Sequence, residues 1–136
     1  MGYLEVENMI KILTNDLKLE IDTQVYDGPS AYNAIIDVSV ESKSFSAKSV
    51  IDSGALQIES FKEQIVDVYD NLRGEAVLEG LGGQKLVFIA SKTGHIKICG
   101  ELKQINPDED FKLSFSVEID QSDLKQSIDK MKTRLE

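Results

Sequence analysis

The chain has 136 residues, of which 41% are hydrophobic and 29% are charged, as in one ordinary globular domain. Its net charge of −9 argues against a nucleic-acid binder, because phosphate contacts need clustered Lys and Arg. The charge favours a basic or neutral partner, although acidity that only keeps a protein soluble gives the same composition.

The cysteine content and the N-terminus indicate a compartment. A single cysteine, Cys99, precludes an intrachain disulfide and fits a reducing environment. The first residues carry Glu5 and Glu7 and lack the basic and apolar regions of a signal peptide. No run of about 18 apolar residues is present, so we expect no membrane span. We therefore expect one cytoplasmic domain over residues 1–136.

The N-terminal part of the chain is typical of strands. Ile10–Leu13 and Leu17–Ile21 form a predicted hairpin with its turn at Asn15-Asp16. Tyr32–Val40 alternates apolar and polar residues, as in a strand with one buried and one wet face.

A helix is predicted from about Leu56 to Arg73. Its apolar residues are three and four positions apart, which places them on one core-facing stripe. They are Ile58, Phe61, Ile65, Val68 and Leu72. Gly74 follows and can adopt the left-handed conformation that ends a helix.

The rest of the chain predicts a meander and a second helix. The expected strands are Ala76–Leu81, Leu86–Ala90, His95–Leu102 and Phe111–Ile119. Gly82-Gly83 can form the tight turn between the first two. The second helix covers about Gln121 to Leu135, and Asp120 is its expected N-cap, because a carboxylate there accepts from free N–H groups of the first turn.

This order of elements indicates the fold class. It lacks the alternation of strands and helices that builds a parallel sheet, and no internal repeat is visible. We therefore predict an α+β fold in which two helices pack on one face of a curved, mainly antiparallel sheet.

His95 and Cys99 are the first candidates for chemistry. They lie four positions apart on one face of a predicted strand, hence roughly 13 Å apart. This separation excludes a Cys–His nucleophile pair, and also a metal site built from these two residues. We interpret His95 as a surface histidine, Cys99 as half-buried and Asp108–Asp110 as a solvated loop. We expect no catalytic residue, no metal ligand and no cofactor.

An acidic strip on the first helix is the candidate binding site. Glu59, Glu63, Asp67 and Asp70 are spaced four, four and three apart, along one side of the helix. Like charges four residues apart repel, so a strip that accepts this repulsion suits a basic protein partner. An ordinary solvated face is the other interpretation. The sheet face around Asp37, Lys97 and Glu118 is the next candidate surface.

An ordered set of residues in the second half of the chain is shared with a known family. It consists of Phe61, Tyr69 and Leu72, then Gly74–Leu78, Gly94-His95-Ile96, Leu113–Val117 and Asp120-Gln121-Ser122. Over about Phe45 to Leu135 this order resembles the WapI-like immunity family of small bacterial proteins. Where the family pattern often has a tyrosine, this chain has Asp123. The resemblance implies a protein that binds the catalytic domain of a polymorphic toxin, often a basic nuclease, and blocks it.

Two functions from different classes stay open. One is an immunity-type protein that binds a toxin domain encoded nearby. The other is a small-ligand-binding or regulatory domain of bacterial metabolism. An apolar cavity of several hundred Å3 between sheet and helices would favour the second, whereas a closed core with an acidic surface would favour the first.

Overall fold

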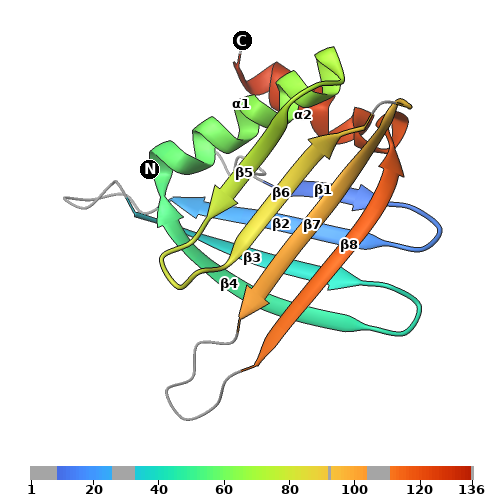
Figure 1. The fold of residues 1–136 in the computed structure, drawn as a ribbon. Coiled ribbons are helices and arrows are strands. Elements are labelled where there is room, and N and C mark those ends of the chain that lie inside the picture. Colours follow the sequence, from blue (N-terminus) through green and yellow to red (C-terminus); the bar gives the residue numbers. More distant parts are fainter. Residues whose placement is uncertain (1–8, 26–32, 92, 104–110, 136) are drawn as a thin grey trace.

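The computed structural model describes residues 9–25, 33–91, 93–103 and 111–135 (Figure 1). Four strands and a helix are followed by four more strands and a second helical segment. The elements are β1 Met9–Leu13, β2 Lys18–Val25, β3 Asn33–Glu41, β4 Ser46–Gly54, α1 Ala55–Asn71, β5 Glu75–Glu79, β6 Lys85–Ala90, β7 His95–Lys103, β8 Lys112–Asp120, the 3-10 turn η1 Gln121–Leu124 and α2 Lys125–Leu135. Tyr32 and the Asp108–Asp110 loop lie outside the described residues.

The α+β class and the antiparallel pairing are confirmed. The strands form two four-stranded sheets, β1-β2-β3-β4 and β5-β6-β7-β8, where we expected one curved sheet. The difference comes from β4, which the sequence analysis did not assign. This strand completes the first meander, and α1 then separates the first sheet from the second. Figure 1 shows the two helices together at one end of the molecule, α1 along β5 and α2 nearer β1.

One continuous hydrophobic core fills the space between the sheets and the helices. Alternate residues of the strands point into it, for example Ile10 and Ile12 of β1 and Ile96 and Ile98 of β7. The ring of Phe61 on α1 meets the ring of Phe88 on β6 edge-on, with centroids 5.7 Å apart, an arrangement that aromatic pairs favour.

The apolar stripe of α1 is confirmed up to its last turn. Ile58, Phe61, Ile65 and Val68 are buried, but Leu72 is only half-buried, so its assignment to the core was wrong. The helix ends at Asn71, and Leu72 itself adopts the left-handed conformation (φ 50°) while its N–H donates to the Val68 carbonyl at 2.9 Å. Its side chain therefore leaves the stripe. Gly74 also has a positive φ of 79°, but it comes after the helix has already ended.

Side chains of the helices hydrogen-bond to the outer edge of the first strand of each sheet. The hydroxyl of Ser127 on α2 accepts from the Lys11 N–H of β1 at 3.2 Å and donates to the Lys11 carbonyl at 2.8 Å. The Gln64 side-chain oxygen on α1 accepts from the Val77 N–H of β5 at 2.9 Å. Each helix therefore closes the free edge of the sheet that it does not directly follow.

The last strand of the first sheet is also covered. The turn between β5 and β6 lies against β4, where the Leu81 N–H donates to the Asp52 carbonyl at 2.9 Å. In the same turn the Gln84 side-chain amide donates to the Val50 carbonyl at 3.4 Å. These contacts join the two sheets along the outer edge of β4.

Candidate functional site

The acidic strip of α1 lies on the solvent side of the helix. Glu59, Glu63, Asp67 and Asp70 are all exposed, opposite the buried stripe that faces the sheets. Among the described residues, none forms an ion pair or a hydrogen bond with the carboxylates of Glu59 and Glu63. These two side chains are therefore free to meet a positively charged partner.

The other two acids of the strip have partners within the chain. The ammonium group of Lys132, on α2, donates to Asp70 Oδ1 at 2.8 Å, and this bond raises the pKa of Lys132 above its usual 10.5. The Asn71 side-chain amide donates to Asp67 Oδ1. Within the described part of the chain, the carboxylates of Glu59 and Glu63 are therefore unpaired, whereas Asp67 and Asp70 each already accept a hydrogen bond at one oxygen.

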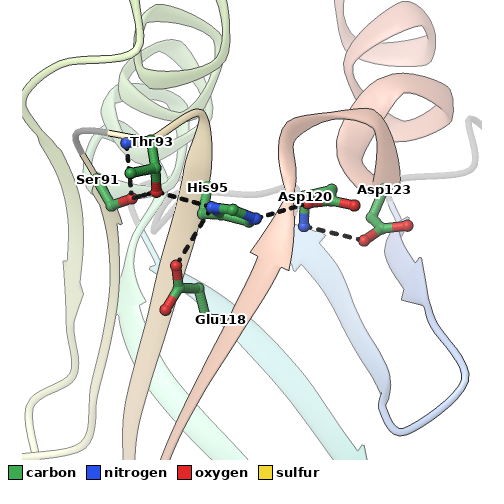
Figure 2. Close-up of polar contacts among 6 residues, drawn as sticks. All are labelled: Ser91, Thr93, His95, Glu118, Asp120 and Asp123. Atoms are coloured by element: carbon green, nitrogen blue, oxygen red, sulfur yellow. Dashed lines mark hydrogen bonds and ion pairs between the residues drawn. The ribbon is translucent and has the colours of Figure 1, made fainter.

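A second polar cluster surrounds His95 at one end of the second sheet (Figure 2). His95 Nε2 lies 2.9 Å from Asp120 Oδ1, because the two residues are directly opposite in the β7–β8 register. The other ring nitrogen, Nδ1, lies 2.8 Å from the Thr93 hydroxyl and 3.5 Å from Glu118 Oε1. The imidazole thus connects the turn before β7 to the end of β8.

The order of groups in this cluster is that of a hydroxyl, an imidazole and a carboxylate, as in a nucleophilic triad. The surroundings oppose that chemistry. Glu118 and Asp120 flank the ring, and Asp123 lies next to Asp120, so an oxyanion forming at Thr93 would meet negative charge where such sites place hydrogen-bond donors. His95 is 41% exposed, which agrees with its interpretation as a surface histidine. The arrangement is better suited to a structural role, in which polar contacts hold the start of β7 against the segment that leads into α2.

Asp120 combines this contact with its expected place before the second helix. It occupies the N-cap of η1 with an extended backbone (φ −76°, ψ 149°). Its carboxylate faces the backbone of Asp123 in a capping-box arrangement, but without a well-formed side-chain hydrogen bond. The bond with good geometry runs the other way, from the Asp120 N–H to Asp123 Oδ2 at 3.1 Å. The N-cap position is confirmed, and the carboxylate is shared between the cap and His95.

The structure places the remaining candidate residues apart. Cys99 is half-buried, as expected, and its thiol lies 3.7 Å from the Ser116 hydroxyl. Lys97 and Glu118 are opposite each other in the second sheet, whereas Asp37 belongs to β3 of the first sheet. The idea of one open face around Asp37, Lys97 and Glu118 was therefore wrong, because it assumed one sheet.

Hollows on the described surface lie outside the core. One of about 410 Å3 covers the outer face of the first sheet and is lined by Glu20, Asp22 and Asp37 among others. Another, of about 920 Å3, lies beside His95 and is lined by Asp16, Glu118, Asp120 and Asp123 among others. No group of three or more His, Cys, Asp or Glu in the described ranges is placed to hold a metal ion. No described helix is long and apolar enough to cross a membrane.

Comparison with known sequences decides the family. Residues 9–136 match the model of the immunity protein WapI-like family. The chain belongs to this family. The resemblance seen in the second half thus extends over nearly the whole WapI-like domain, including the first sheet. No curated protein matches the chain in sequence.

A solved structure shares the architecture of this WapI-like domain. The crystal structures of Trypanosoma bruciei MRP1/MRP2 superpose with a TM-score of 0.57 over 96% of this chain and 85% of that chain. The sequence identity is 10%, so the similarity concerns the fold alone. The arrangement of the two sheets and the helices therefore also occurs outside the immunity family.

The pairing of Asp70 is the part of the site that the sequence analysis missed. Helical spacing treats the four acids of the strip as equivalent. Lys132 reaches Asp70 only because α1 and α2 pack against each other. The available signal was that Lys132 follows Met131, which is buried on α2, and it did not specify which acid Lys132 would meet.

Proposed function

We propose that this chain is an immunity protein that binds a toxin domain of bacterial competition and blocks it without catalysis. The observation that carries the proposal is membership of the WapI-like immunity family over residues 9–136. Immunity in this sense is stoichiometric, because the inhibitor works by covering a surface of the toxin. The half-buried free thiol of Cys99 is in keeping with the cytoplasm as the place of action.

The partner that we propose is a basic protein, and its contact surface is the acidic strip of α1. Glu59 and Glu63 would make the first contacts, since both are exposed and unpaired, and Asp67 and Asp70 would extend the strip. A net charge of −9 raises the association rate with a positive partner by long-range attraction. Toxin domains that act on nucleic acids carry such positive charge, because they must hold phosphates.

The alternative function, a small-ligand domain, has less support. Ligand sites are concave, mostly apolar and enclosed enough to bury most of the ligand. The 410 Å3 hollow lies open on an outward sheet face, where Glu20, Asp22 and Asp37 line it together with Met9 and Val50. The hollow of about 590 Å3 between β1 and α2 is lined mostly by polar residues, among them Asp123, Gln126 and Lys130. The core residues of both sheets pack into one continuous cluster. A closed core with acidic surfaces favours a protein partner.

Co-expression tests the proposal directly. The chain is produced in bacteria together with the toxin domain encoded by the adjacent gene, and growth is compared with that of cells making the toxin domain alone. We expect restored growth and a stable one-to-one complex in size-exclusion chromatography with light scattering. A toxin domain that kills equally in both strains and forms no complex contradicts the proposal.

A further inference from the structure

The outer edge of β8 differs from the other three sheet edges. Each of those edges accepts or donates at least one hydrogen bond to a group outside its sheet, with β1 bonded to Ser127, β4 to Leu81 and β5 to Gln64. Within the part of the chain that the structure describes, no group outside the sheet hydrogen-bonds to the backbone of β8 from Lys112 to Glu118. Figure 1 shows β8 as the outermost strand of its sheet, on the side away from α1. An unpaired edge of this length is a template for another strand.

The register identifies which backbone groups are unpaired. The Gln121 N–H donates to the Gly94 carbonyl at 3.3 Å, one position beyond the His95–Asp120 pair. Hydrogen-bonded pairs alternate along an antiparallel ladder, so Ile119 and every second residue before it bond to β7. The free edge therefore presents the N–H and C=O groups of Lys112, Ser114, Ser116 and Glu118.

The inward side of β8 is also incompletely covered. Leu113, Phe115 and Val117 point toward the core but are only half-buried. On the neighbouring strand β7, the inward side chains of Ile98 and Leu102 are 0% and 3% exposed. A strand added beside β8 would cover the remaining apolar surface of this row as well as satisfy the free backbone groups.

We propose that this edge pairs with β8 of a second copy of the chain, antiparallel and around a two-fold axis. When Phe115 lies opposite Phe115 of the second copy, Lys112 lies opposite Glu118 and Ser114 lies opposite Ser116. All four of these residues have free backbone groups, so they meet as hydrogen-bonded pairs. The opposite charges of Lys112 and Glu118 meet at both ends of the contact and stabilise it.

The charge order along β8 is what favours a second copy over an unrelated strand. Lys112 lies 3.5 Å from Glu101 and Glu118 lies 3.5 Å from His95 within the same sheet. Exposed pairs of this kind are weak, and the two side chains are still 49% and 56% exposed, so both can reach a neighbour. A two-fold contact places each patch against itself, and this patch is complementary to itself. The dimer would join the two second sheets into one continuous sheet. The acidic strip of α1 would stay free, because α1 lies along the opposite edge, at β5.

Charge reversal gives a decisive experiment on the whole chain of 136 residues. Sedimentation velocity is measured over a wide concentration range at about 0.15 M salt, where a Debye length of about 8 Å screens the repulsion between two acidic molecules. We expect a dimer for the wild type. Lys112→Glu and Glu118→Lys each place like charges opposite each other, and each should weaken association by about tenfold or more.

Mixing the two single variants supplies the rescue. A Lys112→Glu chain opposite a Glu118→Lys chain again has opposite charges at both ends, so the mixture should dimerise more tightly than either variant alone. The double variant Lys112→Glu/Glu118→Lys should dimerise like the wild type. Lys85→Glu, on the same face of β6, is the matched control and should leave the dimer intact.

Several outcomes would overturn the proposal. They are a wild type that stays monomeric at every concentration, single variants that dimerise as well as the wild type, or a mixture that fails to associate. Amide hydrogen exchange on the unmodified protein gives a measurement that is independent of variant folding. The Ser114 and Ser116 amides should become protected as the concentration rises, and unchanged exchange at both positions would likewise reject the dimer.

Discussion

Lys132 Nζ lies 2.8 Å from Asp70 Oδ1, so the last helix neutralises one end of the acidic strip on the first helix. The contact joins α2 to α1 on the surface, where the two side chains are 43% and 40% exposed. It divides four similar acids into a paired and an unpaired group, which can be tested separately.

The Lys132–Asp70 pair predicts a stability difference that depends on alkaline pH. The bond to Asp70 raises the pKa of Lys132 above 10.5, so its stabilisation is fully present below that value and is lost as pH rises through the folded pKa. The difference in Tm between the wild type and Lys132→Met should be constant from about pH 7 to pH 10. Above that range it should shrink.

Lys132→Arg is the control for this pH dependence, because a guanidinium keeps its charge over the whole range. Its Tm should fall less than that of the wild type above about pH 11. A Lys132→Met difference that persists unchanged at that pH would show that the pair does not contribute through its charge.

The unpaired half of the strip predicts how fast the toxin partner associates. Glu63→Lys should slow association on the order of threefold to tenfold at low salt, and the effect should fade as salt rises. Glu41→Lys makes the same charge change on an exposed residue of β3 and should slow association less. Stopped-flow fluorescence with the toxin domain measures both rates. Equal rates for the two variants would remove the strip of α1 from the contact surface.

The shared carboxylate of Asp120 predicts a coupled loss of stability. Asp120→Ala should cost about 0.5–2 kcal/mol, since it removes the capping carboxylate, whereas Asp120→Asn should cost less. A double-mutant cycle with His95→Ala should show coupling of about 0.2–1 kcal/mol, the range for exposed ion pairs. Urea titrations of the four proteins give these values. Zero coupling would mean that the His95–Asp120 contact contributes nothing to folding.

The Ser127 hydroxyl, which bonds to the edge of β1, predicts a large loss of stability when that one atom is removed. Ser127 is 4% exposed, and Ser127→Ala leaves both backbone groups of Lys11 without their partner. The loss should be about 1–3 kcal/mol, measured by urea unfolding, and the Lys11 amide should exchange faster. Ser122→Ala, at an exposed position just before α2, should change stability little. Similar losses for the two variants would contradict a specific role for the Ser127 hydroxyl.

Local patterns predicted the elements whose periodicity is strict. The alternation in β3 and β8 and the stripe of α1 each depend on large apolar residues at regular spacing. β4 was missed because its inward side consists of Ala47, Ser49, Ile51 and Ser53. Only one of these, Ile51, is a large apolar residue that a sequence pattern can reveal. The division into two sheets was also missed, since the pattern of a strand says which face is buried and not which strand is its neighbour.

Only the part of the candidate site that lies on a single helix was predictable from the sequence. Helical spacing alone put Glu59, Glu63, Asp67 and Asp70 on one side of α1. The bond between Lys132 and Asp70 joins residues 62 positions apart, so it follows from the packing of the two helices. The cluster around His95 likewise depends on the β7–β8 register, which sets His95 opposite Asp120.

Each helix bonds to the edge of the sheet that it does not directly follow, and this has a consequence for synthesis on the ribosome. The Lys11 backbone is bonded only once Ser127, 116 residues further along the chain, has been synthesised, so the first sheet stays open at one edge until α2 has emerged. Contacts of such sequence separation are slow to form. We therefore expect the two halves to fold together only after α2 has been synthesised, and a nascent chain stalled before α2 to be a target for chaperones and proteases.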